Sequence, residues 1–166
     1  MKKFTGIALI STLLLSLGFV TSCDKKAKYR KQMKKYGAAT RLIWDSEVSE
    51  FNATTKWIVK FDDKKKDEYK KGIGKRLGVY KGLIEKLEKV EAPNKAIEKI
   101  KKLDVDSLKA RRDIIKLWRD QINKDKKPGF GVEYNALNSK YHNLVKERER
   151  LRREYYKKYA KGKKSK

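Results

Sequence analysis

The sequence predicts an all-α protein, an antiparallel helical bundle of three to four long helices with no sheet. Three observations predict this fold class. Between residues 37 and 160, apolar residues recur at intervals of three and four, as on one face of an α-helix. Breaks rich in proline, glycine or charge separate the periodic stretches. The stretches reach roughly 25 to 30 residues, and long helices joined by short turns tend to lie antiparallel.

The first predicted helix begins in the basic stretch after Tyr29 and ends near residues 62–66, where apolar residues stop. Acidic residues within residues 62–68 are interrupted by three lysines and lack the ligand order of an EF-hand loop. We therefore expect a solvated turn there, with acids near the start of the next helix. The apolar positions of the first helix are Leu42, Ile43, Val48, Phe51, Trp57, Ile58 and Phe61.

The second predicted helix contains four glycines, each of which costs about 0.5–1 kcal/mol in a helix interior. They are explained either by the close approach of another helix or by a helix that begins nearer Leu77. We favour the second interpretation. The apolar seam of this helix is Ile73, Leu77, Tyr80, Ile84, Leu87 and Val90, and the glycines are Gly72, Gly74, Gly78 and Gly82.

Two further breaks define the rest of the bundle. Pro93 disfavours helical geometry at the residue before it, so residues 91–94 form a turn. The third helix then extends to Ile122, with a kink or brief break expected around residues 104–106. Residues 127–131 contain a proline and two glycines and separate it from a last helix that includes Leu137 and Tyr155. The alternative architecture is a three-helix bundle with a loose first segment.

The amino terminus has the pattern of an export signal. Lys2 and Lys3 precede an apolar, uncharged run over residues 4–20, which has the length of a secretory signal and is marginal for a transmembrane helix. The run ends in Val20-Thr21-Ser22-Cys23. This tetrapeptide resembles the lipobox of bacterial lipoproteins. The resemblance implies that a diacylglyceryl group is transferred to the Cys23 thiol and that the chain is cleaved before Cys23.

We expect four segments on this basis: a lipoprotein signal peptide (1–22), a basic membrane-proximal segment (23–36), a helical bundle domain (37–160) and a disordered basic tail (161–166). Cys23 is the one cysteine, so no internal disulfide can form. The mature protein is then anchored in a bacterial cell membrane on the extracytoplasmic side. Asp24 resembles an inner-membrane retention signal of enterobacterial lipoproteins, but the inner and the outer membrane both stay open.

A second topology follows from the charges behind the apolar run. Positive residues directly after a membrane segment favour the cytoplasmic side, so an uncleaved anchor would leave the domain in the cytoplasm.

The formal net charge of +25 predicts attraction to polyanions. Removal of residues 1–22 takes away only two of these charges, Lys2 and Lys3. Near the end of the last helix, cations alternate with Tyr155, Tyr156 and Tyr159, a mixture suited to a membrane interface. The same mixture also ends a helix whose dipole favours cations. The candidate polyanion-binding residues are Lys25, Lys26, Lys28, Arg30, Lys31, Arg152, Arg153, Lys157, Lys158 and Lys161.

Residues for chemistry are scarce. His142 is the single histidine and lies off the apolar seam, so we expect it to face solvent or lie at the boundary of the core. One histidine and one acylated cysteine cannot assemble an ordinary zinc site. The stretch from Gly72 to Lys75 follows no strand, so it is no phosphate-binding loop. We expect no enzyme activity, no cofactor and no metal.

The sequence therefore favours a non-catalytic, lipid-anchored envelope protein whose basic helical domain binds an acidic surface or partner, such as anionic lipid or an envelope polymer. The cations between Lys25 and Lys35 would act as a second membrane signal beside the lipid. The alternatives are a surface adhesin for sulfated or phosphorylated polymers, a chaperone-like assembly factor and, in the inverted topology, a cytoplasmic nucleic-acid-binding protein.

Overall fold

Four long helices make up the described chain. The computed structural model describes the backbone of residues 7–160 and the side chains of residues 25–159. The helices are α1 (Ile7–Val59), α2 (Lys66–Lys89), α3 (Lys95–Asn123) and α4 (Val132–Ala160), with one 3₁₀ turn, η1 (Asp63–Lys65). Residues 7–160 contain no strand, which confirms the predicted all-α fold. Within residues 25–159, no helix has a stretch long and apolar enough to cross a membrane.

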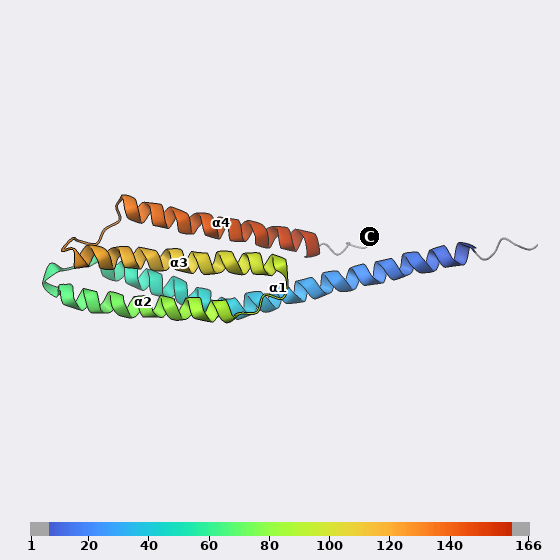
Figure 1. Ribbon diagram of the computed structural model, residues 1–166, viewed down its shortest axis with the longest axis horizontal. Coiled ribbons are helices and arrows are strands. Elements are labelled where there is room, and N and C mark those ends of the chain that lie inside the picture. Colours follow the sequence, from blue (N-terminus) through green and yellow to red (C-terminus); the bar gives the residue numbers. More distant parts are fainter. Residues whose placement is uncertain (1–6, 161–166) are drawn as a thin grey trace, which may run out of the picture.

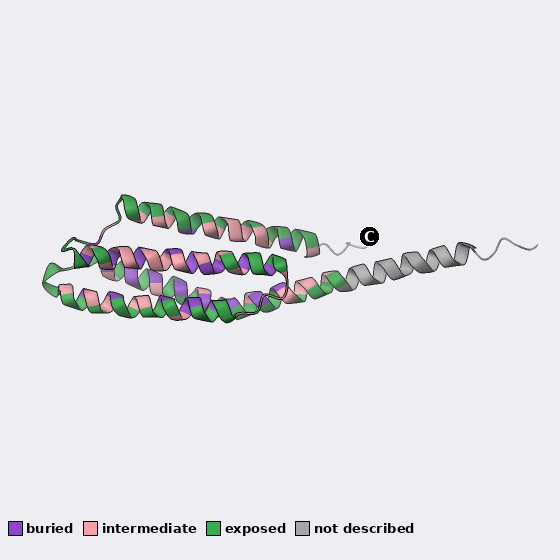
Figure 2. Ribbon diagram, viewed as in Figure 1, coloured by how far each residue is buried: buried purple, intermediate pink, exposed green. Residues whose placement is uncertain are grey.

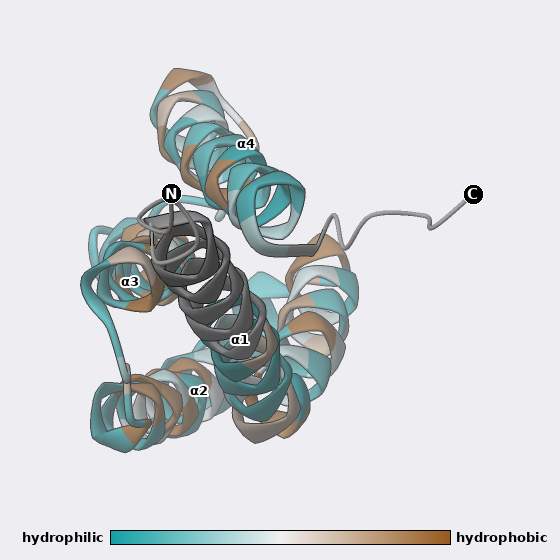
Figure 3. Cartoon of the chain, turned by 90° about the vertical axis from the view of Figure 1, so that its right-hand side faces the viewer, coloured by the Kyte–Doolittle hydropathy of each residue, from teal (hydrophilic) through white to brown (hydrophobic). Residues whose placement is uncertain are grey.

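The helices follow an up-down-up-down course (Figure 1). α3 packs along both α2 and α4, and α1 contacts all three of the other helices. Figure 3 looks along the bundle and shows α3 lying between α2 and α4. One end of the bundle therefore holds the α1–α2 and α3–α4 connections. The other end holds the turn between α2 and α3, the carboxyl end of α4 and the point where α1 enters the bundle (Figure 1).

Apolar side chains form three successive clusters along the bundle, and buried positions recur along all four helices (Figure 2). Full burial of one such side chain stabilises the fold by about 1.5–3 kcal/mol. The cluster nearest the α3–α4 loop surrounds Trp118, the middle cluster surrounds Leu87 and Leu108, and the third joins Met33 and Tyr36 to Tyr155. Trp118 is fully buried, and Trp57 packs against the same cluster.

α2 corrects the expectation that the helix begins nearer Leu77, because it begins at Lys66 and contains all four glycines. Its first turns are held by Tyr69, which is buried and stacks on Trp57 with ring centroids 4.2 Å apart. A Cβ atom at Gly72 would lie 2.5 Å from Cη2 of Trp57. Close approach therefore explains Gly72. At Gly74, Gly78 and Gly82 an added Cβ meets nothing within 4 Å.

Two other boundaries also differ from the sequence expectations. α1 begins at Ile7, well before Tyr29. α3 continues as one helix through residues 104–106, so it has no break there. Asp104 points into the bundle, where two hydrogen bonds compensate its burial, and it therefore does not interrupt the helix.

The expected turns are confirmed. Asn94 caps α3, because its side-chain oxygen accepts hydrogen bonds from the amides of Ala96 and Ile97 at 3.1 and 3.0 Å. At the other end of α3, the Trp118 indole donates to the Gly129 carbonyl at 3.2 Å. The Gly129 amide in turn donates to the Gln121 side chain at 3.0 Å. These bonds hold the proline- and glycine-containing loop against the end of the core.

The glycines of α2 supply a matched test of packing. Gly72→Ala should lower the free energy of unfolding by about 1–2 kcal/mol, because overpacking against Trp57 outweighs the helix propensity gained. Gly78→Ala should raise it by about 0.5–1 kcal/mol, because its Cβ meets open space. Urea denaturation followed by circular dichroism measures both. Equal stabilisation by the two substitutions would contradict the close approach at Gly72.

Candidate functional site

The two basic stretches singled out in the sequence meet at one end of the bundle. Residues 24–36 hold seven lysines and arginines and one acid, and residues 148–160 hold six and two acids. Arg30 Nε donates to the Tyr159 carbonyl at 2.9 Å, and the Tyr155 hydroxyl donates to the Tyr29 carbonyl at 2.9 Å. We call residues 25–36, 90–99 and 148–159 the basic end of the bundle.

Three tyrosines hold the first and last helices together there. The ring centroids of Tyr29 and Tyr159 are 4.4 Å apart, and those of Tyr155 and Tyr159 are 4.8 Å apart. Tyr155 is 4% exposed, whereas Tyr156 is 41% exposed. Tyr155 and Tyr159 are one turn apart and face α1, so they pack the fold. Of the three tyrosines expected at an interface, Tyr156 alone is exposed.

Most of the predicted cations of this end are exposed, and two are partly engaged in the fold. The Arg30 side chain is half-buried against α4, and Arg152 forms an ion pair with Glu149 at 3.5 Å. Lys26 is also half-buried. The side chains of Cys23 and Lys161 lie outside the described residues. The exposed cations are Lys25, Lys28, Lys31, Arg153, Lys157 and Lys158.

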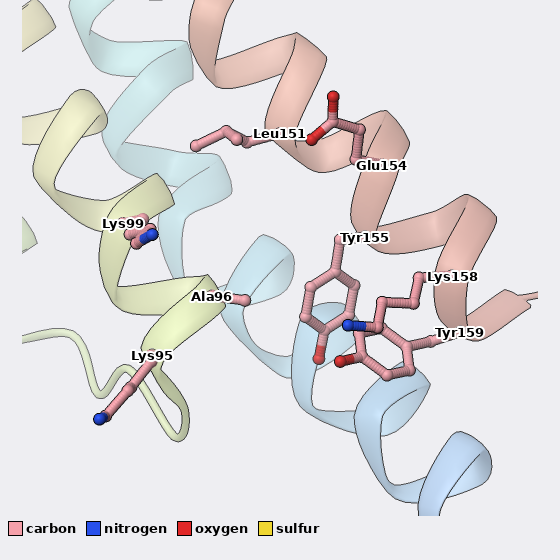
Figure 4. Close-up of a pocket in the computed structure, with 8 residues that line it drawn as sticks. All are labelled: Lys95, Ala96, Lys99, Leu151, Glu154, Tyr155, Lys158 and Tyr159. Atoms are coloured by element: carbon pink, nitrogen blue, oxygen red, sulfur yellow. The ribbon is translucent and has the colours of Figure 1, made fainter.

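A pocket of about 380 Å³ lies between the start of α3 and the end of α4 (Figure 4). Its lining combines cations with apolar and aromatic groups. Lys95 and Lys99 come from the first turns of α3, and Lys158 comes from α4. None of these three lysines forms an ion pair with another described residue. The remaining lining residues are Ala96, Leu151, Glu154, Tyr155 and Tyr159.

Lys95 and Lys99 were not among the candidate residues from the sequence. The sequence contains a signal for these two lysines, because they lie just after the turn predicted at residues 91–94. In an up-down bundle that turn lies at the same end as the start of the first helix and the end of the last. The cations beside the turn therefore belong to the same surface, although they are distant in sequence.

A second cluster of titratable groups lies inside the bundle. Asp104 and Glu47 are each 1% exposed. Asp104 accepts hydrogen bonds from the Tyr36 hydroxyl at 2.6 Å and from Arg148 Nη1 at 3.2 Å. Arg111 Nε lies 3.2 Å from a carboxylate oxygen of Glu47.

Aromatic rings enclose the two arginines of this cluster. The Arg111 guanidinium lies 3.7 Å from the ring centroid of Phe51 and 3.6 Å from that of Tyr141. The Arg148 guanidinium lies 4.5 Å from the ring centroid of Trp44. Such cation–π contacts favour the charged arginine where water is excluded. The arginines are thereby oriented toward the buried carboxylates.

Burial raises the pKa of the Asp104 carboxyl, and the hydrogen bond from Tyr36 and the charge of Arg148 oppose that rise. Burial likewise raises the pKa of the Glu47 carboxyl against the charge of Arg111. Burial also raises the pKa of the Tyr36 hydroxyl well above its ordinary value, so that it remains a hydrogen-bond donor. These groups connect α1, α3 and α4, with the carboxylates buried and Arg111 and Arg148 only 13% and 12% exposed, which is the arrangement of structural ion pairs.

His142 is exposed, as expected, with its ring 5.3 Å from that of Tyr141. Among the described side chains, no group of three or more histidine, cysteine or acidic residues is placed to hold a metal ion. Comparison with known proteins gives no match to a family model, a curated protein or a solved structure. The structure itself defines an all-α protein, a four-helix bundle with one strongly basic end.

Arg148 tests the interior cluster. Arg148→Met should lower the free energy of unfolding at neutral pH by about 3–5 kcal/mol, because Asp104 loses its buried cation. The loss should shrink as the pH falls toward 3.8, the ordinary pKa of the carboxyl. The folded protein, whose Asp104 pKa is raised, takes up the proton at a higher pH than the unfolded chain, so acidification stabilises the folded variant in that window.

Urea denaturation at a series of pH values measures this effect. The exposed Lys157→Met serves as the control and should change stability by less than about 0.5 kcal/mol. A loss in Arg148→Met that is the same at every pH would show that Arg148 stabilises the fold through its contact with Trp44 and not through its charge.

Proposed function

We propose that this chain is a non-catalytic, lipid-anchored protein of the bacterial cell envelope, whose basic helical bundle binds the acidic surface of its own membrane. The anchor is inferred from the likeness of Val20-Thr21-Ser22-Cys23 to a lipobox. The acidic surface is inferred from the charge of the bundle.

The observation that carries the proposal is the meeting of the two basic segments beside the proposed lipid. Arg30 bonds to Tyr159 at 2.9 Å, which brings the carboxyl end of α4 to the start of the bundle. Arg30 is seven residues from Cys23, which corresponds to about 10 Å along a helix. A lipid on Cys23 would therefore hold both basic segments close to the headgroups.

The energetics favour two signals acting together. A single acyl chain binds a membrane marginally, and a polybasic patch beside the lipid makes the attachment stable. Each cation close to an anionic leaflet adds about 1 kcal/mol within a Debye length of about 10 Å. Lys25, Lys28 and Lys31 are exposed and lie within this distance of one another along α1. The combination supports a bundle held at the membrane and not on a long stalk.

The charge asymmetry of the bundle supports a preferred orientation. Residues 24–36, at the basic end, hold seven cations and one acid, whereas residues 54–72, at the opposite end, hold seven cations and four acids. A surface adhesin for sulfated polymers would be expected to direct its strongest positive charge away from its anchor. A cytoplasmic nucleic-acid-binding protein would need the inverted topology, and binding to DNA in dilute salt would not distinguish it.

The lipid anchor is tested by metabolic labelling with a palmitate analogue in a bacterial host. The protein should take up label, and Cys23→Ser should abolish the labelling because the thiol is the acceptor. An inhibitor of lipoprotein signal peptidase should cause the precursor to accumulate. Equal labelling of both proteins, or none in either, would refute the anchor and direct attention to the inverted topology.

The charge is tested separately on a variant that begins at Asp24 and therefore lacks both the acceptor thiol and the apolar run. Replacement of Lys25, Lys28 and Lys31 by glutamine should weaken binding to vesicles containing phosphatidylglycerol by up to about 1 kcal/mol per lysine. Replacement of Lys64, Lys65 and Lys71, which removes the same charge at the opposite end, should have a smaller effect. Vesicle sedimentation at two salt concentrations measures both, and equal effects would contradict an oriented basic end.

A further inference from the structure

We propose that the pocket between α3 and α4 binds one anionic phospholipid headgroup, with its phosphate held by Lys95, Lys99 and Lys158. This inference rests on the proposed function, because it requires the basic end to meet a membrane. The proposed function requires only a general electrostatic attraction of the basic segments to the membrane, whereas this inference assigns one defined lipid-binding site.

The cations of the pocket are available for a ligand. Lys95 and Lys99 are one helical turn apart on α3, and Lys158 projects from α4 on the other side (Figure 4). No described acid pairs with any of the three. The one acid in the lining, Glu154, forms an ion pair with Arg150, which it shares with Glu147, so its charge is partly compensated. Flexible lysine stems with three donors each can close around a phosphate.

The side chains supply the ligands, because the helix terminus is already capped. The Asn94 side chain accepts hydrogen bonds from the Ala96 and Ile97 amides at 3.1 and 3.0 Å. The same residue donates to Gln32 at 2.9 Å and to the Tyr155 hydroxyl at 3.3 Å. Asn94 therefore fixes the start of α3 against α1 and α4, so that the two walls of the pocket are held at a constant separation.

The apolar part of the lining favours a lipid over a free anion. Ala96 and Leu151 are joined by the rings of Tyr155 and Tyr159, so cations border an aromatic and aliphatic wall. This is the combination found where a headgroup meets acyl chains, with aromatic rings at headgroup level. A volume of about 380 Å³ lies within the range of small-molecule sites and accommodates a glycerophosphate headgroup.

The position of the pocket identifies the source of the lipid. Tyr159, in its wall, contacts the ring of Tyr29 at 4.4 Å between centroids. Tyr29 is six residues from Cys23, about 9 Å along a helix. A lipid on Cys23 would thus keep the pocket near the headgroup plane. The phospholipids of that leaflet would be its most concentrated anionic ligands.

The site is tested with the chain purified from membranes in an uncharged detergent. Short-chain phosphatidylglycerol is titrated in, and hydrogen exchange is followed in peptides covering residues 95–99 and 151–159. Protection should rise with phosphatidylglycerol and be absent with phosphatidylcholine of the same chain length. The Lys95→Gln, Lys99→Gln, Lys158→Gln variant should need roughly a hundredfold more lipid, from a loss of about fivefold per lysine.

A matched variant with Lys64, Lys65 and Lys71 changed to glutamine loses the same charge at the opposite end and should bind within about twofold of the unchanged chain. Circular dichroism establishes that both variants remain helical. Equal protection by inorganic phosphate would show a simple anion site and overturn the lipid assignment. Equal weakening in both triple variants would show diffuse charge attraction and also overturn it.

The palmitate experiment keeps this inference separate from the proposed function. A labelled, membrane-bound protein whose pocket shows no protection by phosphatidylglycerol would refute the pocket and leave the anchor intact. An unlabelled protein would refute the anchor, and with it the argument that the pocket lies near the headgroup plane.

Discussion

The pairing of the buried carboxylates with arginine is the constraint on which the bundle depends. Asp104 sits on the central helix and is reached by Tyr36 from α1 and by Arg148 from α4. A buried carboxylate without partners would cost several kcal/mol, so the register that brings these groups together is favoured over registers that separate them. Apolar contacts alone tolerate sliding and exchange of similar side chains, whereas these bonds are lost when the helices slide. The same alignment determines which cations lie together at the basic end of the bundle.

The net charge of the chain and the paired charges in its core have opposite effects on the stability of the fold. A large excess of exposed cations opposes compaction, because like charges repel across a small molecule. Inside the core, Glu47 pairs with Arg111 and Asp104 pairs with Arg148. An aromatic ring also covers each arginine, as Phe51 and Tyr141 cover Arg111. Of the acids in the described part of the chain, Glu47 and Asp104 alone are buried, and residues 25–36 contain no acid.

Sequence periodicity was sufficient for the fold class and for the turns, since apolar spacing and proline or glycine breaks are local signals. It failed where a distant residue decides the outcome. Nothing near Gly72 in the chain reveals that Trp57 lies against it, and an acid at position 104 looks like a break until its partners on α1 and α4 are known. For the same reason the basic stretches could be found from sequence, but the contribution of Lys95 and Lys99 depended on which ends of the helices meet.

The tyrosine contact between α1 and α4 also determines how the molecule carries force. Tyr29 lies six residues after the proposed attachment point. Its ring contacts Tyr159 and its carbonyl accepts a hydrogen bond from Tyr155, both near the far end of the sequence. Tension applied through Cys23 would pass at once into both the first and the last helix, along their axes. Helices loaded in parallel must slide past one another to separate, so the bundle would resist being pulled open from its tether. Force on the amino-terminal end of the bundle would therefore act on α1 and α4 together.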